Sequence, residues 1–249
     1  MIQNMFANMP PVVKNILLLN VVMYIIALLG EAQGIPVTRL LGGYVFNSPY
    51  FEPYQMVTHF FMHSTQTFFH IFFNMFAFVV FGSMLERVWG PKRFFIFYVA
   101  TAIGAFIFHQ LFGYWEVKSL EAELLAQGFN EYKLREIVQE AISKNLATDN
   151  ALLNQYILGL GTPVVGASGA VYGVLVAFGY LFPNTQLMLL FPPIPVKAKW
   201  LVIFLVGVAI YNSFISNPGD NVAHLAHLGG AIVGFILVLY WQKSTRNFY

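Results

Sequence analysis

Six stretches of apolar sequence constrain this chain more than any other feature, because each is long enough, or nearly long enough, to cross a lipid bilayer as a helix. They lie at about residues 12–30, 66–85, 94–114, 165–182, 199–215 and 222–241. Of the 249 residues, 58% are hydrophobic and 10% are charged, against about 45–50% and about 25% in soluble domains. We therefore expect an all-α membrane protein in which six transmembrane helices form one bundle over residues 1–249.

The cationic residues indicate how such a bundle is oriented. If the N-terminus is cytoplasmic, eight cations lie inside with Glu86 as the only inside acid, namely Lys14, Arg87, Lys92, Arg93, Lys197, Lys199, Lys243 and Arg246. The positive-inside rule therefore predicts that both termini are cytoplasmic. The first stretch has a single nearby cation and a poor cleavage site at its exit, GEAQG, so we expect a retained helix rather than a signal peptide.

Two of the predicted external segments are more than simple turns. Residues 31–65 are apolar and aromatic with Gly and Pro punctuation, and we expect this loop to lie partly in the membrane interface. Residues 116–150 carry most of the charge and read as two amphipathic helices broken at Gly128, with Asn130 as a candidate cap. We expect them to form a soluble external insertion.

Four hydrogen-bonding side chains within the stretches lie at a similar depth. At about 1.5 Å per residue, Ser168 and His227 both lie about 21 Å along their helices from the predicted cytoplasmic ends. His70 and Asn74, at about 24 and 18 Å, bracket that level. Polar groups inside a bilayer are costly, so their convergence in one layer indicates a functional site.

Pairs of glycines on two of these stretches would allow close helix packing. Gly169 and Gly173 form one small-xxx-small pair, and Gly230 and Gly234 form another. His227 falls on the same helical face as the second pair. We therefore expect the fourth and sixth helices to approach closely with His227 at their contact.

This contact would place a serine beside a histidine. Cysteine is absent, so a covalent mechanism must use oxygen or nitrogen. Ser168 is then the candidate nucleophile and His227 its base, with the Tyr172 ring stacked on the imidazole. His70 and Asn74 are candidate donors to the oxyanion. Taken singly, GxSG and GxxxG are more often packing devices, and an intramembrane histidine can be purely structural.

Four short motifs occur in order along the second, fourth and sixth stretches. They are His70 and Asn74 in HIFFN, Glu86–Gly90 in ERVWG, Gly166, Ser168, Gly169 and Tyr172 in GASGAVY, and Ala226, His227, Gly230 and Gly234 in AHLGGAIVG. In this combination they resemble the rhomboid family of intramembrane serine proteases, and the resemblance covers most of the chain. It implies a six-helix rhomboid-like bundle of the bacterial type.

The resemblance also assigns roles to individual residues. It implies a catalytic dyad of Ser168 and His227, and an oxyanion hole made by His70, Asn74 and the backbone N–H of Ser168. Gly166, Gly169, Tyr172, Gly230 and Gly234 would support the site. The loop at 31–65 would dip into the membrane, and the segment at about 216–223 would be a mobile cap.

A function follows as an expectation from these roles. The chain would be a serine endopeptidase that cleaves transmembrane segments near their outer ends, at helix-breaking sequences with small P1 residues such as alanine. Its partners would be transmembrane protein substrates and the lipid bilayer, with no nucleic acid, metal or other cofactor. We expect it in a bacterial plasma membrane. The sequence leaves the substrate and the oligomeric state open.

Some residues depart from the family pattern. Tyr54 and Gln55 stand where the family usually has a Trp-Arg pair, so the loop at 31–65 would be anchored differently. The insertion at 116–150 is longer than expected. His224 precedes His227 by one turn, and we interpret it as a secondary polar residue near the cavity.

Three further histidines have weaker functional signals. His59 and His63 are spaced like zinc ligands, but HExxH is absent, and a metalloprotease is therefore disfavoured. We expect His109 to be structural.

Two alternatives to a protease are an inactive rhomboid-like escort protein and a transporter. Inactive relatives of this kind lack the serine or the histidine. A transporter would carry ionisable residues inside its spans.

Overall fold

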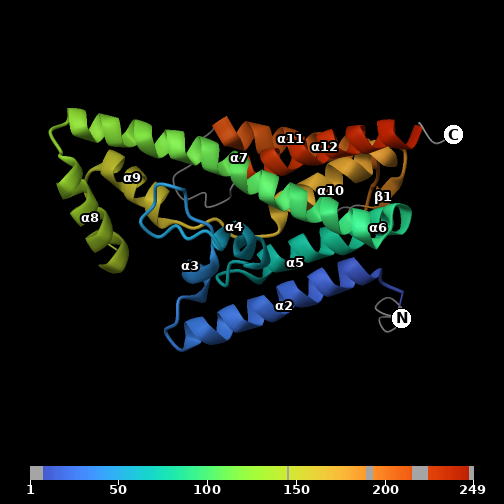
Figure 1. The fold of residues 1–249 in the computed structure, drawn as a ribbon, viewed down its shortest axis with the longest axis horizontal. Helices are drawn as coiled ribbons and strands as arrows, with labels where there is room; N and C mark the ends of the chain where they lie inside the picture. Colours follow the sequence, from blue (N-terminus) through green and yellow to red (C-terminus); the bar gives the residue numbers. More distant parts are fainter. Residues whose placement is uncertain (1–7, 145, 189–192, 215–223, 247–249) are drawn as a thin grey trace.

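The protein is an all-α membrane bundle in which each of the six predicted stretches forms a helix (Figure 1). The computed structural model describes residues 8–144, 146–188, 193–214 and 224–246. The bundle helices are α2 (Pro11–Ala32), the second span (α5 Phe68–Ala77, η2 Phe78–Gly82 and α6 Ser83–Trp89), α7 (Pro91–Ala126), α10 (Ser168–Leu181), α11 (Ala198–Phe214) and α12 (His224–Arg246). Among the described residues, α2, the second span, α7 and α12 are long and apolar enough to cross a membrane, whereas α10 and α11 are shorter.

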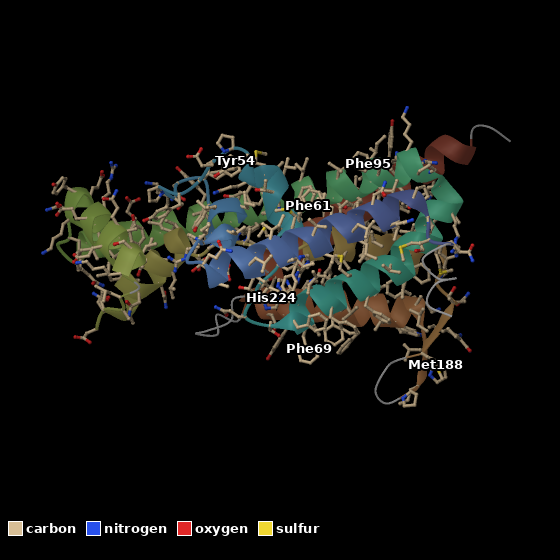
Figure 2. The ribbon with its side chains drawn as sticks, turned by 90° about the horizontal axis from the view of Figure 1, so that it is seen from below. Tyr54, Phe61, Phe69, Phe95, Met188 and His224 are labelled. Atoms are coloured by element: carbon tan, nitrogen blue, oxygen red, sulfur yellow. The ribbon has the colours of Figure 1, made fainter. Side chains whose placement is uncertain are left out.

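The helices run along the long axis of the molecule, with both termini at one end and α8 and α9 at the other (Figure 1). We call these the terminal end and the insertion end. Large apolar side chains such as Phe69 and Phe95 project outward from the bundle (Figure 2) and are 64% and 51% exposed. Such surfaces suit contact with lipid tails. At the terminal end, β1 (Gln186–Met188) and β2 (Pro195–Lys197) form a small antiparallel pair, which the sequence did not predict.

Helix α10 is short because it begins inside the bundle. Its 14 residues span about 21 Å, less than the thickness of a bilayer core. The preceding residues are extended, and Val164 exchanges two backbone hydrogen bonds of 2.8 and 2.9 Å with Gly43. Non-helical backbone at membrane depth is tolerated where it is buried in protein and its polar groups are paired. The start of α10 is therefore an internal position.

The loop at 31–65 contains α3 (Val37–Leu41), α4 (Gln55–Thr58) and a 3₁₀ turn, η1 (His59–Phe61). Buried Gln110 on α7 holds this loop, because its amide donates to the carbonyl oxygen of Tyr44 at 2.8 Å and accepts from the N–H of Phe46 at 2.8 Å. Gln55, which departs from the family pattern, is also buried and bonds within the loop, donating to the Tyr50 carbonyl at 3.0 Å. The loop is therefore held to α7 by Gln110 and cross-linked internally by Gln55.

The segment at 116–150 differs from its predicted form. Its first helix is a continuation of α7, which runs on to Ala126 instead of ending near residue 114. The break at Gly128 is present, with φ of +93°, and Asn130 caps α8 (Glu131–Lys144) by accepting from the Lys133 N–H at 2.8 Å. A further helix, α9 (Ala151–Gly161), was not predicted.

These three helical segments share a small apolar core of their own. It contains Val117 and Leu124 of α7, Leu134 of α8 and Tyr156 of α9, and it includes Val45 from the loop at 31–65. The hydroxyl of Ser48 in the same loop donates to the Leu160 carbonyl at 2.6 Å. The insertion and the loop therefore pack as one unit at the insertion end.

Glu86 joins the second span to the start of α2. Its buried carboxylate accepts hydrogen bonds from the backbone N–H groups of Val12 at 3.0 Å and Val13 at 2.8 Å. The first N–H groups of a helix have no partner within the helix, so this carboxylate acts as an N-terminal cap supplied by a distant residue. The acidic residue of ERVWG therefore has a structural role.

We expect Glu86→Ala to lower the free energy of unfolding by about 2 kcal/mol, because it leaves one buried and one part-buried N–H group of α2 without acceptors. Denaturant titration in mixed detergent micelles would measure the loss. The exposed Glu136→Ala on α8 is the matched control and should change stability little. Equal effects of the two substitutions would contradict the capping role.

Candidate active site

Ser168 and His227 meet inside the bundle. Ser168 is the first residue of α10, and His227 lies in the first turn of α12. His227 Nε2 is 2.7 Å from the Ser168 hydroxyl oxygen, although the residues are 59 positions apart in the chain. His227 is 9% exposed. The geometry is that of a hydroxyl whose proton can pass to a neutral imidazole.

Glycines bring the two helices close enough for this contact. A Cβ atom built on Gly230 would overlap the carbonyl oxygen of Gly169, and one on Gly234 would lie 2.7 Å from the Cα of Gly173. Both neighbours are backbone atoms, which cannot rotate away as a side chain can. All four glycines of the two small-xxx-small pairs therefore lie along the contact between α10 and α12.

Tyr172 packs against the imidazole of His227. Its ring is stacked on that of His227, with ring centroids 4.4 Å apart and an interplanar angle of 7°. Tyr172 lies one turn along α10 from Ser168, so the same helix supplies both the hydroxyl and the stacking ring. Stacking fixes the plane of the imidazole and thus the direction of Nε2.

His70 approaches the same hydroxyl from the second span. A Cβ atom on Gly166 would lie 2.9 Å from His70 Nε2 and 3.6 Å from the Ser168 hydroxyl oxygen. Gly166 has φ of +123°, a conformation that side chains disfavour, so glycine is required there for two reasons. His70 Nε2 and the Ser168 hydroxyl therefore both border the space next to Gly166.

The other two candidate oxyanion donors are arranged differently. The Asn74 side-chain amide donates to the His70 carbonyl oxygen at 2.8 Å, one turn back on α5. An amide NH₂ group carries two hydrogens, so the second is left for another acceptor. The N–H of Ser168 is at the first position of α10 and has no acceptor within that helix.

The two histidines of the zinc-like spacing belong to the loop before α5. The ring of His63 is fully buried and lies edge-on to His70, with centroids 5.2 Å apart. Burial, and secondly the neighbouring His70, lower the pKa of His63 to about 3. Burial also lowers the pKa of His59 to about 4, and its Nδ1 contacts the Gln55 carbonyl oxygen at 2.7 Å. Both rings are therefore neutral at physiological pH.

His224 lies at the start of α12 and is labelled in Figure 2. Its ring is perpendicular to that of His227, with centroids 5.9 Å apart and an interplanar angle of 85°. It is therefore adjacent to the histidine of the candidate dyad, as its one-turn spacing predicts. The predicted cap at about 216–223 lies outside the described residues.

A small enclosed cavity borders Ser168 on the side of α7. It is lined by Phe60, Ala102, Ala105, Phe106, Gly169 and Ala226, among others, and holds about 10 Å³ of free space. That is close to the smallest cavity that admits one water. The α7 residues could not be identified from the sequence, because alanine and phenylalanine in an apolar helix carry no chemical signal.

Comparison with known proteins places this arrangement in context. The family model for the Rhomboid domain matches residues 50–117 and 140–244, and the gap between the two parts falls within the insertion. Similar proteins include Rhomboid protein 1, mitochondrial, of Saccharomyces cerevisiae, which is 30% identical over 184 residues, 74% of this chain and 41% of that protein. RHOMBOID-like protein 12, mitochondrial, of Arabidopsis thaliana is 30% identical over 179 residues, 72% of this chain and 44% of that protein.

A bacterial protein is similar over a comparable length of this chain. Rhomboid protease AarA of Providencia stuartii is 28% identical over 183 residues, which is 71% of this chain and 51% of that protein. The chain therefore spans about half or less of the length of the relatives named here.

Proposed function

Because this chain belongs to the rhomboid family, we propose that it is an intramembrane serine endopeptidase with Ser168 as nucleophile and His227 as general base. The observation that carries the proposal is the 2.7 Å contact between His227 Nε2 and the Ser168 hydroxyl oxygen. The bacterial relative named as a rhomboid protease supports the same activity.

The proposed reaction follows from the groups at the site. Ser168 attacks the scissile carbonyl while His227 takes its proton and then returns it to the leaving amine. The negative charge on the carbonyl oxygen is stabilised by His70, the second hydrogen of Asn74 and the N–H of Ser168. Water then hydrolyses the acyl-enzyme with His227 again acting as base.

The proposed substrates are transmembrane segments of other proteins. A helical peptide bond is shielded by its own hydrogen bonds, so cleavage requires a segment that unwinds beside Ser168. We propose a small P1 side chain such as alanine, as the resemblance to the family implies. The charge distribution supports cytoplasmic termini, with the insertion end outside, and we propose a bacterial plasma membrane as the location.

A fluorophosphonate probe tests the proposal directly. The purified protein in detergent should be labelled on Ser168, and Ser168→Ala and His227→Ala should both abolish the label. Ser213→Ala is the matched control, because its hydroxyl in α11 only donates to the Ala209 carbonyl at 2.7 Å. A folded native protein that is neither labelled nor able to cleave a transmembrane substrate would instead support an inactive, escort-type relative.

A further inference from the structure

The C-terminal turn of α2 carries a carboxylate that receives two hydroxyl hydrogen bonds. Thr38 of α3 donates to Glu31 Oε1 at 2.5 Å, and Thr65 donates to Glu31 Oε2. All three residues are half-buried. We call this arrangement the Glu31 clasp. It joins the end of α2 and helix α3 to the connection before α5, which lies 34 positions further along the chain, and the dyad does not use it.

The clasp fixes the short connection that leads into α5. Within this connection Met62 is fully buried and packs with Ala27 and Val37. Thr65 is held by Glu31, and the Thr67 side chain caps α5 by accepting from the Phe69 N–H at 3.3 Å. Ser64 lies between these anchored residues, so its backbone has little freedom to move.

The backbone of Ser64 in turn determines the protonation of His70. The Ser64 N–H donates to His70 Nδ1 at 3.2 Å. A nitrogen that accepts a hydrogen bond carries no proton, so a neutral imidazole must carry its proton on Nε2. That nitrogen is the one that lies next to Gly166, whose other side borders the Ser168 hydroxyl. His70 is therefore presented to the site as an Nε2–H donor.

We infer that Glu31 and Thr65 are positioning residues for catalysis, which hold the connection before α5 so that Ser64 keeps His70 in the Nε2–H tautomer. This inference rests on the proposed function only for its kinetic consequence. Thr38 belongs to the same clasp but joins Glu31 to α3 and not to the connection that carries Ser64. We therefore expect substitution of Thr65, but not of Thr38, to change the tautomer of His70.

The kinetic test compares these two threonines with a transmembrane model substrate. Losing an oxyanion donor costs about 10²–10³ in kcat, so loosening one should cost less, about 10-fold. We expect Thr65→Val to lower kcat about 10-fold with KM unchanged, Thr65→Ser to restore it, and Thr38→Val to change kcat less than 2-fold. In a His70→Ala background, Thr65→Val should have no further effect, because its action passes through His70. Equal losses for Thr65→Val and Thr38→Val, or a full further loss in the His70→Ala background, would overturn the inference.

The spectroscopic test does not depend on proteolysis. Nitrogen-15 NMR of the His70 ring, in protein carrying Ser168→Ala, should report the Nε2–H tautomer. Thr65→Val should give a mixture of tautomers, whereas Thr38→Val should give the native spectrum. An Nδ1–H tautomer in the native connection, or an unchanged spectrum in Thr65→Val, would contradict the clasp. If the native chain cleaves nothing, the proposed function fails while this measurement still decides the role of Glu31 and Thr65.

Discussion

Ser168→Ala, His227→Ala and the double substitution should all reduce the cleavage of a transmembrane substrate to nearly the same residual rate. Groups that act as one catalytic unit are strongly non-additive, and removal of a serine nucleophile or its histidine base costs about 10⁶ in kcat in a soluble serine protease. The contact of 2.7 Å between Ser168 and His227 indicates that they form such a unit. We expect each single variant to lose at least about 10⁴ in kcat.

Single-turnover cleavage in detergent or liposomes would measure these rates. Stability should be measured beside the rates, because Ser168→Ala removes only one oxygen atom and is expected to leave the fold intact. If the double variant were slower than the native protein by the product of the two single effects, the two side chains would act independently and the dyad would be wrong.

Gly230→Ala should have the second largest effect, although Gly230 contacts no substrate in the proposed mechanism. The added methyl group would overlap the Gly169 carbonyl oxygen, so α10 and α12 must move apart. Overpacking of this kind costs about 3 kcal/mol of stability. Misplacement of reacting groups by about 1 Å costs about 10²-fold in rate, and we expect a loss of that size in both cleavage and fluorophosphonate labelling.

Gly207→Ala on α11 is the matched control. A Cβ atom at Gly207 would meet nothing within 4 Å. Because alanine favours a helix over glycine by about 0.8–1 kcal/mol, this variant should be as stable as the native protein or slightly more stable. Denaturant titration and labelling rates would compare the two. Native labelling by Gly230→Ala would show that the close approach of the helices is not needed for the dyad.

Much of the site could be predicted from the sequence because a bilayer imposes a common scale of depth. Counting residues along helices placed Ser168 and His227 at one level, bracketed by His70 and Asn74, and the glycine pairs indicated which helices touch. The structure brings Ser168 and His227 into contact, and α10 and α12 approach each other along the glycines. The stacking of Tyr172 on His227 also agrees with its prediction, since a one-turn spacing on a helix determines which side chains share a face.

Features that depend on contacts between irregular segments could not be predicted in this way. Glu31 and Thr65 are 34 positions apart, and the short helices and turns between them carry no long periodicity that would fix the direction of the chain. The continuation of α7 to Ala126 and the presence of α9 were missed for a related reason. The end of an apolar stretch marks where a helix leaves the lipid, and it does not show that the helix ends there.

The division of the proposed dyad between α10 and α12 has a consequence for the synthesis of the protein. Ser168 is synthesised 59 residues before His227, which corresponds to about 3–12 s at about 5–20 residues per second. During that interval the serine has no base, and the glycine surface of α10 has no partner helix. Under the proposed mechanism, a nascent chain that already holds Ser168 would therefore be inactive beside the other membrane proteins being inserted. Cleavage would begin only when α12 has been inserted and has packed against α10.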